Sequence, residues 1–309
     1  MVKRVQFDVD PKCVGHGIRV IAENFDSAAE LVSVCRDRPV SSYYRSHAYF
    51  NKDLHGGEWA DFEDSADLIR LVENGVKDQT LLEGVGRYAR TARVKDEEKL
   101  TQKCMDVMGG GVDVPSFLTG VPTCMHSLRR KKVKSKIIKI GIYCHVLCNI
   151  SAEQYKQAGE LITKTVAKLE KAGYRIRMRA VDIYEDGDWY CRPRADFDGR
   201  HTLWMVTHMV KRENEPMNYR RIMFPITRVA YERGLGFAWM AVNGSPNISG
   251  LGGQASRVVS DPGEFEDIVA KGCGEEDYII FSQDEVIGYI QRYGMDKAQK
   301  MVEAKVLSS

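Results

Sequence analysis

The 309-residue sequence lacks any hydrophobic run that approaches the roughly 18 apolar residues of a membrane span. Its first residues, MVKRVQFDVDPKCVGHG, contain no apolar segment of the kind found in secretory signals. The formal net charge is only +2, which by itself points to no class of ligand. These absences predict a cytoplasmic protein that has no membrane partner.

Sequence motifs of common enzymes are also missing. The glycine-rich stretches at 109–111 and 250–253 are not followed by the Lys-Ser/Thr of a phosphate-binding loop, and no G-x-S-x-G elbow occurs. The eight cysteines form no C-x-x-C and are scattered among apolar residues, which is typical of free buried thiols in a reducing compartment. We therefore expect no cofactor, and the lack of a catalytic set favours a protein that is not an enzyme.

The near-neutral total hides an uneven distribution of charge. Residues 1–128 carry 16 Lys and Arg against 20 Asp and Glu, whereas residues 129–139 carry seven basic residues and no acid. The remainder is close to neutral. One short segment, RRKKVKSKIIK, thus holds nearly all of the charge asymmetry.

The first 128 residues predict a small α-rich region. Apolar residues at helical spacing indicate a helix over residues 27–37 capped by Asp26, one over 65–74 closed by Gly75, and one that begins at Gln79 and runs to about residue 105. The stretch 109–125 is rich in glycine and proline and is expected to be a loop.

From residue 136 the pattern alternates between strands and helices. Strands are expected at 136–145, 174–183, 203–211, 236–242 (GFAWMAV) and 277–281, with helices at 152–172, 218–233, 264–272 and 283–293. Such alternation predicts an α/β fold with a mainly parallel, Rossmann-like sheet and helices on both faces. The expected organisation is an α-rich region (1–128), a basic hinge and strand start (129–139) and an α/β domain (136–309).

Carboxylates follow the second of these strands. Asp182, Asp186 and Asp188 lie near a strand end, where α/β sheets place ligands, and are weak candidates for metal ligands of a hydrolase or nucleotidyl enzyme. Solvated carboxylates in a turn explain Asp186-Gly-Asp188 equally simply, and we favour that reading, with no metal site.

The basic segment is a candidate for nucleic-acid binding, because Lys and Arg neutralise phosphates and release counterions. Aromatic residues in the stretch 40–60 can supply stacking surfaces. The alternative is a solvated linker, since the sequence pI of about 8.0 is below that of a typical nucleic-acid-binding domain. The candidate contacts are Arg129, Arg130, Lys131, Lys132, Lys134 and Lys136.

The second part of the chain resembles the von Willebrand factor A-like fold, through KIIKIGIYCHVLCNIS (136–151), GYRIRMRAVDIYE (173–185) and DYIIFSQDEV (277–286). That fold usually binds a divalent metal through Asp-x-Ser-x-Ser after its first strand. The matching positions here run from His145 to Asn149 and lack the leading Asp and both Ser, although Ser151 lies two residues further on. The resemblance therefore implies a fold whose metal site is degraded.

A closer resemblance is to uncharacterised proteins of tailed bacteriophages, over segments 62–75, 111–125, 150–178 and 214–234. It implies a viral context, in the host cytoplasm or the virion, but no activity. Its most specific element is the loop GVDVPSFLTGVPTCM, with Gly111, Asp113, Pro115 and Phe117. We expect Asp113 to cap a turn and the loop to dock the α-rich part onto the sheet, with ligand contact as the alternative.

Three hypotheses remain. The first is a non-enzymatic, phage-encoded binding or assembly protein that acts on a protein partner or a second copy of itself. The alternatives are a nucleic-acid-binding protein that uses segment 129–139, and a metal-dependent enzyme that uses the Asp182 group.

Overall fold

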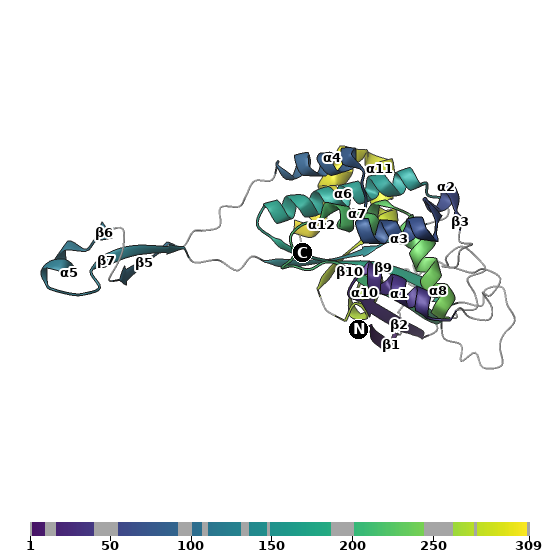
Figure 1. Cartoon of the computed structure of the whole chain (residues 1–309), viewed down its shortest axis with the longest axis horizontal. Helices are drawn as coiled ribbons and strands as arrows, with labels where there is room; N and C mark the ends of the chain where they lie inside the picture. The colour runs from purple at the N-terminus through teal and green to yellow at the C-terminus, as the bar shows by residue number, and fades with distance from the viewer. Residues whose placement is uncertain are drawn as a thin grey trace.

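A computed structural model describes residues 2–9, 17–39, 55–91, 101–106, 111–130, 136–146, 149–186, 201–243, 262–274 and 277–307 (Figure 1). Its main feature is a six-stranded sheet in the order β1-β2-β10-β9-β8-β11. The strands are β1 (Lys3–Val9), β2 (Ile18–Phe25), β8 (Ile137–Tyr143), β9 (Arg175–Asp186), β10 (His201–Lys211) and β11 (Tyr278–Ser282).

Parallel and antiparallel pairs are mixed in this sheet. β8 pairs in parallel with β9 and with β11, and β2 pairs in parallel with β10, whereas β1–β2 and β9–β10 are antiparallel. The predicted α/β class with a mainly parallel sheet is confirmed. The sheet does not follow the expected division into 1–128 and 136–309, because β1 and β2 come from the first segment and are hydrogen-bonded to strands of the second.

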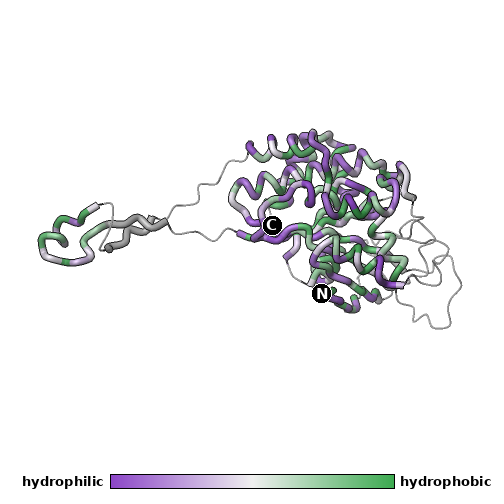
Figure 2. The backbone as a smooth tube through the Cα atoms, in the orientation of Figure 1, coloured by the Kyte–Doolittle hydropathy of each residue, from purple (hydrophilic) through white to green (hydrophobic). Residues whose placement is uncertain are grey.

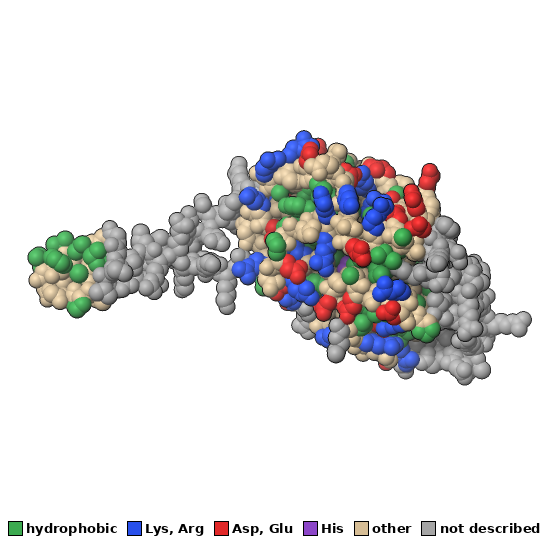
Figure 3. All heavy atoms as spheres, viewed as in Figure 1, with side chains coloured by type: hydrophobic (Ala, Val, Ile, Leu, Met, Phe, Trp, Pro, Cys, Tyr) green, Lys and Arg blue, Asp and Glu red, His purple; other side chains and the backbone are tan. Residues whose placement is uncertain are grey.

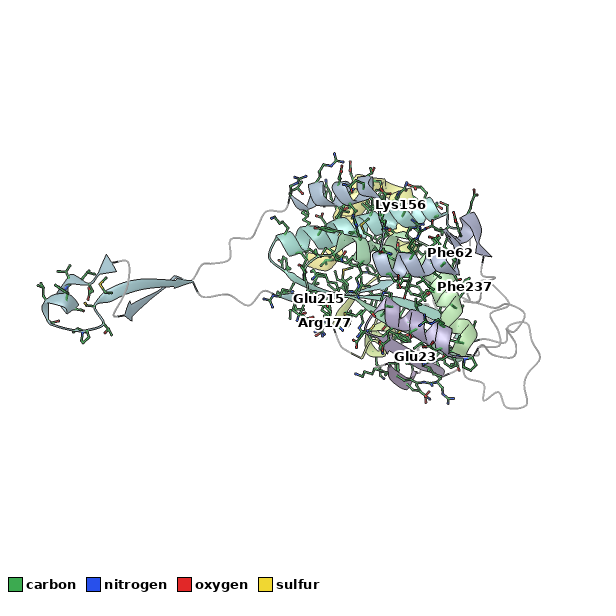
Figure 4. The ribbon with its side chains drawn as sticks, viewed as in Figure 1. Glu23, Phe62, Lys156, Arg177, Glu215 and Phe237 are labelled. Carbon is green, nitrogen blue, oxygen red and sulfur yellow. The ribbon has the colours of Figure 1, made fainter. Side chains whose placement is uncertain are left out.

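Helices lie on both faces of the sheet, as predicted, but unequally (Figures 1 and 4). The larger core contains Ile140, Met178 and Val206 of the sheet together with most of the helices, and the smaller one packs Val181 and Met205 against α10. The helices of the body are α1 (Ala28–Asp37), α2 (Gly57–Ala60), α3 (Ser65–Asn74), α4 (Gln79–Ala89), α6 (Ala152–Lys171), α7 (Tyr219–Thr227), the π-helix η2 (Tyr231–Gly236), α8 (Phe237–Asn243), α10 (Pro262–Gly272), α11 (Gln283–Tyr293) and α12 (Met295–Leu307); β3 (His55–Gly56) and β4 (Phe62–Asp64) form a short hairpin.

Side-chain caps set where these helices begin. Ser27, rather than the expected Asp26, caps α1 by accepting a hydrogen bond from the Glu30 backbone N–H. Ser151 and Gln154 form a capping box at the start of α6, and Gly75 ends α3 with a φ of +67°. The predicted helices at 65–74, 152–172 and 283–293 are confirmed within a residue.

The prediction of a strand at GFAWMAV is wrong, because this segment is helix α8. Ala238, Trp239, Met240 and Ala241 are all buried. A short run that is apolar on every side has neither the period of a strand nor that of an amphipathic helix, so the sequence pattern does not distinguish the two. In the structure, the segment follows directly on the π-helix η2 and continues it as helix α8.

A second, smaller sheet forms an arm that lies apart from the body in Figure 1. It has the order β5-β7-β6, with β5 (Thr101–Asp106), β6 (Gly111–Val112) and β7 (Met125–Arg130), all antiparallel. Residues 101–105, expected to end a helix, are instead strand β5. The short helix α5 (Val114–Leu118) lies between β6 and β7 at the tip.

Gly159 allows α6 and α7 to pack closely. A Cβ atom at this position would lie 1.7 Å from the carbonyl oxygen of Ile226. Backbone atoms cannot move aside as a flexible side chain can, so only glycine fits here.

We therefore predict that Gly159→Ala lowers the free energy of unfolding by about 1–3 kcal/mol or more, as expected for overpacking. The matched control is Gly86→Ala in α4, where a Cβ would meet nothing within 4 Å and helix propensity favours alanine by about 1 kcal/mol. Urea denaturation measures both. Equal stabilities of the two variants would contradict the close approach of α6 and α7.

Candidate functional site

The three carboxylates named as weak candidates for metal ligands are not gathered together. Asp182 is fully buried on β9, Asp186 is the last residue of the same strand, and Asp188 lies outside the described residues. Four strand residues span roughly 13 Å, so the backbone positions of Asp182 and Asp186 are too far apart for one ion. Within the described ranges, no group of three His, Cys, Asp or Glu side chains is arranged to hold a metal ion.

Asp182 instead belongs to a buried ionisable cluster at the carboxyl ends of β8 and β9. Nδ1 of His145, two residues after β8, lies 3.6 Å from Asp182 Oδ1 and 3.2 Å from Glu232 Oε1. The Tyr184 hydroxyl donates a hydrogen bond to Asp182 Oδ2. All four side chains are at most 3% exposed. We call His145, Asp182, Tyr184 and Glu232 the buried cluster.

The local backbone explains how these groups meet. Asp182 and Tyr184 are two residues apart on β9 and therefore point to the same face of the sheet. Glu232 is carried by η2, a π-helical turn of a kind that often occurs at functional sites. Gly236 of the same turn packs against the cluster, since a Cβ there would lie 2.0 Å from the Tyr184 hydroxyl oxygen.

Burial and charge act in opposite directions on His145. Loss of solvent lowers its pKa, but the nearby carboxylates of Asp182, Glu232 and Asp284 raise it to about 9. Burial, assisted by the charge of Asp182, raises the pKa of Glu232 to about 8, against the opposing charge of His145. The folded cluster therefore holds protons more tightly than the unfolded chain does.

Chemically, the cluster can store a proton, but it lies below the surface of the described residues. The neighbouring Cys144 does not pair with His145. Its thiol lies 3.3 Å from the Ile142 carbonyl oxygen, and burial raises its pKa well above the ordinary value. A thiolate nucleophile at Cys144 is therefore disfavoured. The cysteines that the structure describes, Cys35, Cys124, Cys144 and Cys273, are free and buried.

A separate hollow of about 390 Å³ lies where α1, α3 and α7 meet the end of β10. His208 lines it, and Arg221 and Glu73 are also part of its wall. Burial, with the charges of Arg179 and Arg221, lowers the pKa of His208 to about 3, so this ring is neutral. Its Nδ1 lies 3.1 Å from the Tyr231 hydroxyl oxygen. The wall thus contains groups of both charge signs.

The arm tip, defined as residues 111–125, exposes an unusual concentration of apolar side chains. Five of the eight large apolar side chains that are exposed in the described residues lie on it (Figures 2 and 3). They are Val112 (47% exposed), Val114 (58%), Phe117 (62%), Leu118 (78%) and Val121 (41%).

The backbone of the arm tip is nevertheless well ordered by hydrogen bonds. The Asp113 N–H donates to the Cys124 carbonyl (2.7 Å) and the Val121 N–H to the Ser116 carbonyl (3.0 Å). The Asp113 carboxylate accepts from the Ser116 hydroxyl instead of capping a backbone N–H. Pro115 starts α5. The expectation that this loop docks the α-rich part onto the sheet is wrong, because Phe117 faces solvent.

The basic segment connects the arm to the body. The backbone of Arg129 and Arg130 belongs to β7, residues 131–135, including Lys131, Lys132 and Lys134, lie outside the described residues, and Lys136 is exposed just before β8. The aromatic residues of segment 40–54 also lie outside the described ranges.

Sequence reasoning missed His145, Tyr184 and Glu232 as partners of Asp182. In the sequence, His145 marks the position where the metal-binding Asp of the von Willebrand factor A-like motif is absent, and nothing there links it to Asp182. Glu232 carried one signal, namely that it is the only acidic residue of the predicted helix 218–233. Nothing local in the sequence indicates that this helix continues as a π-turn beneath the ends of β8 and β9.

These features define an α/β protein that has a mixed six-stranded sheet, a buried ion cluster and a protruding arm. Over residues 8–304 the chain matches a family described as a domain of unknown function (DUF7192), and it belongs to that family. No curated protein and no solved structure gives a significant match. None of the described helices is long and apolar enough to cross a membrane.

The buried cluster predicts a pH-dependent stability. Because the folded-state pKa values of His145 and Glu232 are raised, their contribution is complete below the unfolded values and is lost as pH rises through about 8–9. We expect the free energy of unfolding to fall between about pH 5 and pH 9, by up to roughly 1.4 kcal/mol per pH unit for each extra proton bound.

Glu232→Gln tests the origin of this effect, because it removes the titrating carboxylate and keeps its shape. We expect a shallower pH dependence in denaturant titrations between pH 5 and pH 8. Glu83→Gln, on the exposed side of α4, is the control and should keep the wild-type slope. A wild-type slope in Glu232→Gln would mean that other groups cause the pH dependence.

Proposed function

We propose that this protein is a non-enzymatic binding or assembly protein, and that it holds a partner macromolecule through the arm tip. The observation that supports this proposal most directly is the concentration of five exposed apolar side chains within ten residues of the arm. Surfaces of this kind mark interaction sites, because exposed apolar area in water has a free-energy cost that a partner removes.

The order within the arm tip supports a binding role. The hydrogen bonds around Asp113, Ser116 and Val121 hold the apolar side chains on a defined backbone. A preformed surface loses less conformational entropy when it binds, so more of the burial energy is available for affinity. Burying Phe117 and Leu118 would contribute roughly 1.5–3 kcal/mol each.

The arrangement of the body is consistent with a scaffold. The buried cluster is closed from solvent, and no described group is arranged to hold a metal. We include in the proposal a von Willebrand factor A-like relationship for strands β10-β9-β8-β11. It is supported by parallel neighbours on both sides of β8 and by the β9–β10 hairpin.

A bacteriophage context and a place in the host cytoplasm or the virion complete the proposal. They rest on the resemblance of segments 62–75, 111–125, 150–178 and 214–234 alone.

Site-specific photocrosslinking tests the role of the arm tip. A benzophenone amino acid at position 118 should give a discrete macromolecular adduct in cells that contain the partner. Adding Val114→Ser and Phe117→Ser to that chain should remove the adduct, since losing each buried apolar side chain weakens binding by about ten- to a hundredfold.

The control places the same probe at position 307, where Leu307 is 60% exposed on the body. Unfolding transitions of all variants should match wild type, because the arm tip lies outside the core. Identical adducts from positions 118 and 307, or none from position 118, would refute the proposed role.

A further inference from the structure

We infer that the hollow between α1, α3, α7 and β10 binds a small zwitterion, namely a free amino acid with an apolar side chain. The carboxylate of this ligand faces the first turn of α1 and Arg221, and its ammonium group faces Glu73 at the end of α3. The hollow belongs to the body and not to the arm tip, so the inference goes beyond the proposed function. It is supported by the position of the hollow and by the groups that line it.

The hollow lies at the carboxyl ends of two parallel strands, β2 and β10, whose pairing ends at Phe25 and His208. Sheets of α/β proteins place ligands beyond such strand ends. The helices that follow these strands, α1 and α7, begin beside the hollow, and α3 packs against both of them (Figure 1). The volume of about 390 Å³ is within the ordinary range of small-molecule sites.

The first turn of α1 and Arg221 supply positive charge to the hollow. Ser27 accepts a hydrogen bond from the Glu30 N–H, whereas the N–H groups of Ala28 and Ala29 have no partner among the described residues. Both alanines line the hollow. The guanidinium of Arg221 lines it too and forms no salt bridge with a described residue. Free N–H groups at a helix start and a guanidinium are the groups that bind carboxylates most readily.

His208 adds a buried donor. It is 2% exposed and shares the sheet face of Val206 and Val210, which α1 and α7 cover. Its neutral ring has Nδ1 3.1 Å from the Tyr231 hydroxyl oxygen. Since this hydroxyl has no other hydrogen-bond partner in the described residues, both groups are satisfied when the hydroxyl donates to Nδ1 and the ring proton is on Nε2. The Nε2–H then has no protein partner in the described part of the chain, and a carboxylate in the hollow would accept from it.

The last turn of α3 supplies negative charge to the same hollow. Glu73 lines it and forms no salt bridge with a described residue, Arg221 included. The carbonyl groups at the end of α3 add partial negative charge, as at any helix C-terminus. A simple anion bound here would be repelled by Glu73. A ligand that carries both a carboxylate and an ammonium group would instead pair with Arg221 and with Glu73.

The remaining lining is mainly apolar. Small-molecule sites combine an apolar lining with a few polar groups that fix the orientation of the ligand. An apolar side chain on the amino acid would remove this lining from water. The apolar residues are Val72, Met209, Val210, Phe224 and Pro225.

Isothermal titration calorimetry of the full chain with leucine, methionine and phenylalanine tests the inference. We expect at least one of them to bind at a single site. The analogues that lack one charge, which for leucine are 4-methylpentanoate and 3-methylbutylamine, should bind at least about tenfold more weakly, because each leaves a charged group of the protein without its partner. Failure of all three amino acids to bind would overturn the inference, and so would equal affinity for the amino acid and its ammonium-free analogue.

Two single substitutions locate the site. Arg221→Gln and Glu73→Gln change exposed residues and should each weaken binding of the amino acid about ten- to a hundredfold. The matched controls Arg87→Gln and Glu83→Gln change exposed residues of α4 outside the hollow and should bind as wild type does. Wild-type affinity in either Arg221→Gln or Glu73→Gln would contradict the proposed pairing of charges.

Nuclear magnetic resonance of the chain labelled with ¹⁵N-alanine tests where the carboxylate lies. Adding the amino acid should shift the amide signals of Ala28 and Ala29 but not those of Ala158 and Ala298, which are buried in α6 and α12. Unmoved signals of Ala28 and Ala29 would refute the role of α1. The photocrosslinked adduct from position 118 should be the same in Arg221→Gln as in wild type, so the hollow and the arm tip are tested independently.

Discussion

The parallel ladder between β2 and β10 is the constraint on which the rest of the structure depends. Eight residue pairs, from Ile18–His201 to Phe25–His208, join the beginning of the chain to residues 201–208. Because β2 and β10 are neighbours in the sheet, the chain between them starts from this sheet and comes back to it. The arm is an insertion within this part of the chain. It is therefore attached to the body at two points, the end of α4 and the start of β8, and not through a single linker. A ribbon held at both ends presents its tip with less conformational freedom than a free terminus would, which suits a surface that is built to bind.

Much of this architecture could be predicted from sequence, and the failures have physical reasons. Amphipathic helices with a cap and a terminal glycine, such as 65–74 and 152–171, are specified by neighbouring residues, and so are apolar strands such as 137–143. The pairing of β2 with β10 is specified by residues that lie nearly two hundred positions apart, so a local pattern cannot reveal it. GFAWMAV was misassigned because burial on all sides erases the periodicity that separates a helix from a strand. The buried cluster was missed for a similar reason, since His145, Asp182 and Glu232 come from three separate elements.

Neutralisation of charge explains how the buried cluster is tolerated inside the protein. Two carboxylates placed within reach of each other in a dry interior repel strongly unless a cation or a proton neutralises them. Here the imidazole of His145 lies beside both, and the raised pKa values of His145 and Glu232 show that protons supply the neutralisation. The chain lacks the acidic and hydroxyl ligands that would hold a metal after β8, and an ionisable ring follows that strand instead. The ends of β8, β9 and η2 are thus joined by charge and protons, which makes this end of the sheet sensitive to pH.

The arm tip shows the opposite arrangement to the buried cluster, because its apolar side chains face water whereas the ionisable groups of the cluster lie inside. Chain segments that merely connect elements are usually polar at their tips, since exposed Phe, Leu and Val promote non-specific association. In this arm those residues are gathered on a backbone ordered by hydrogen bonds. Gathering apolar side chains at the end of one ordered ribbon lets a single partner cover all of them at once, with little loss of conformational entropy in the backbone.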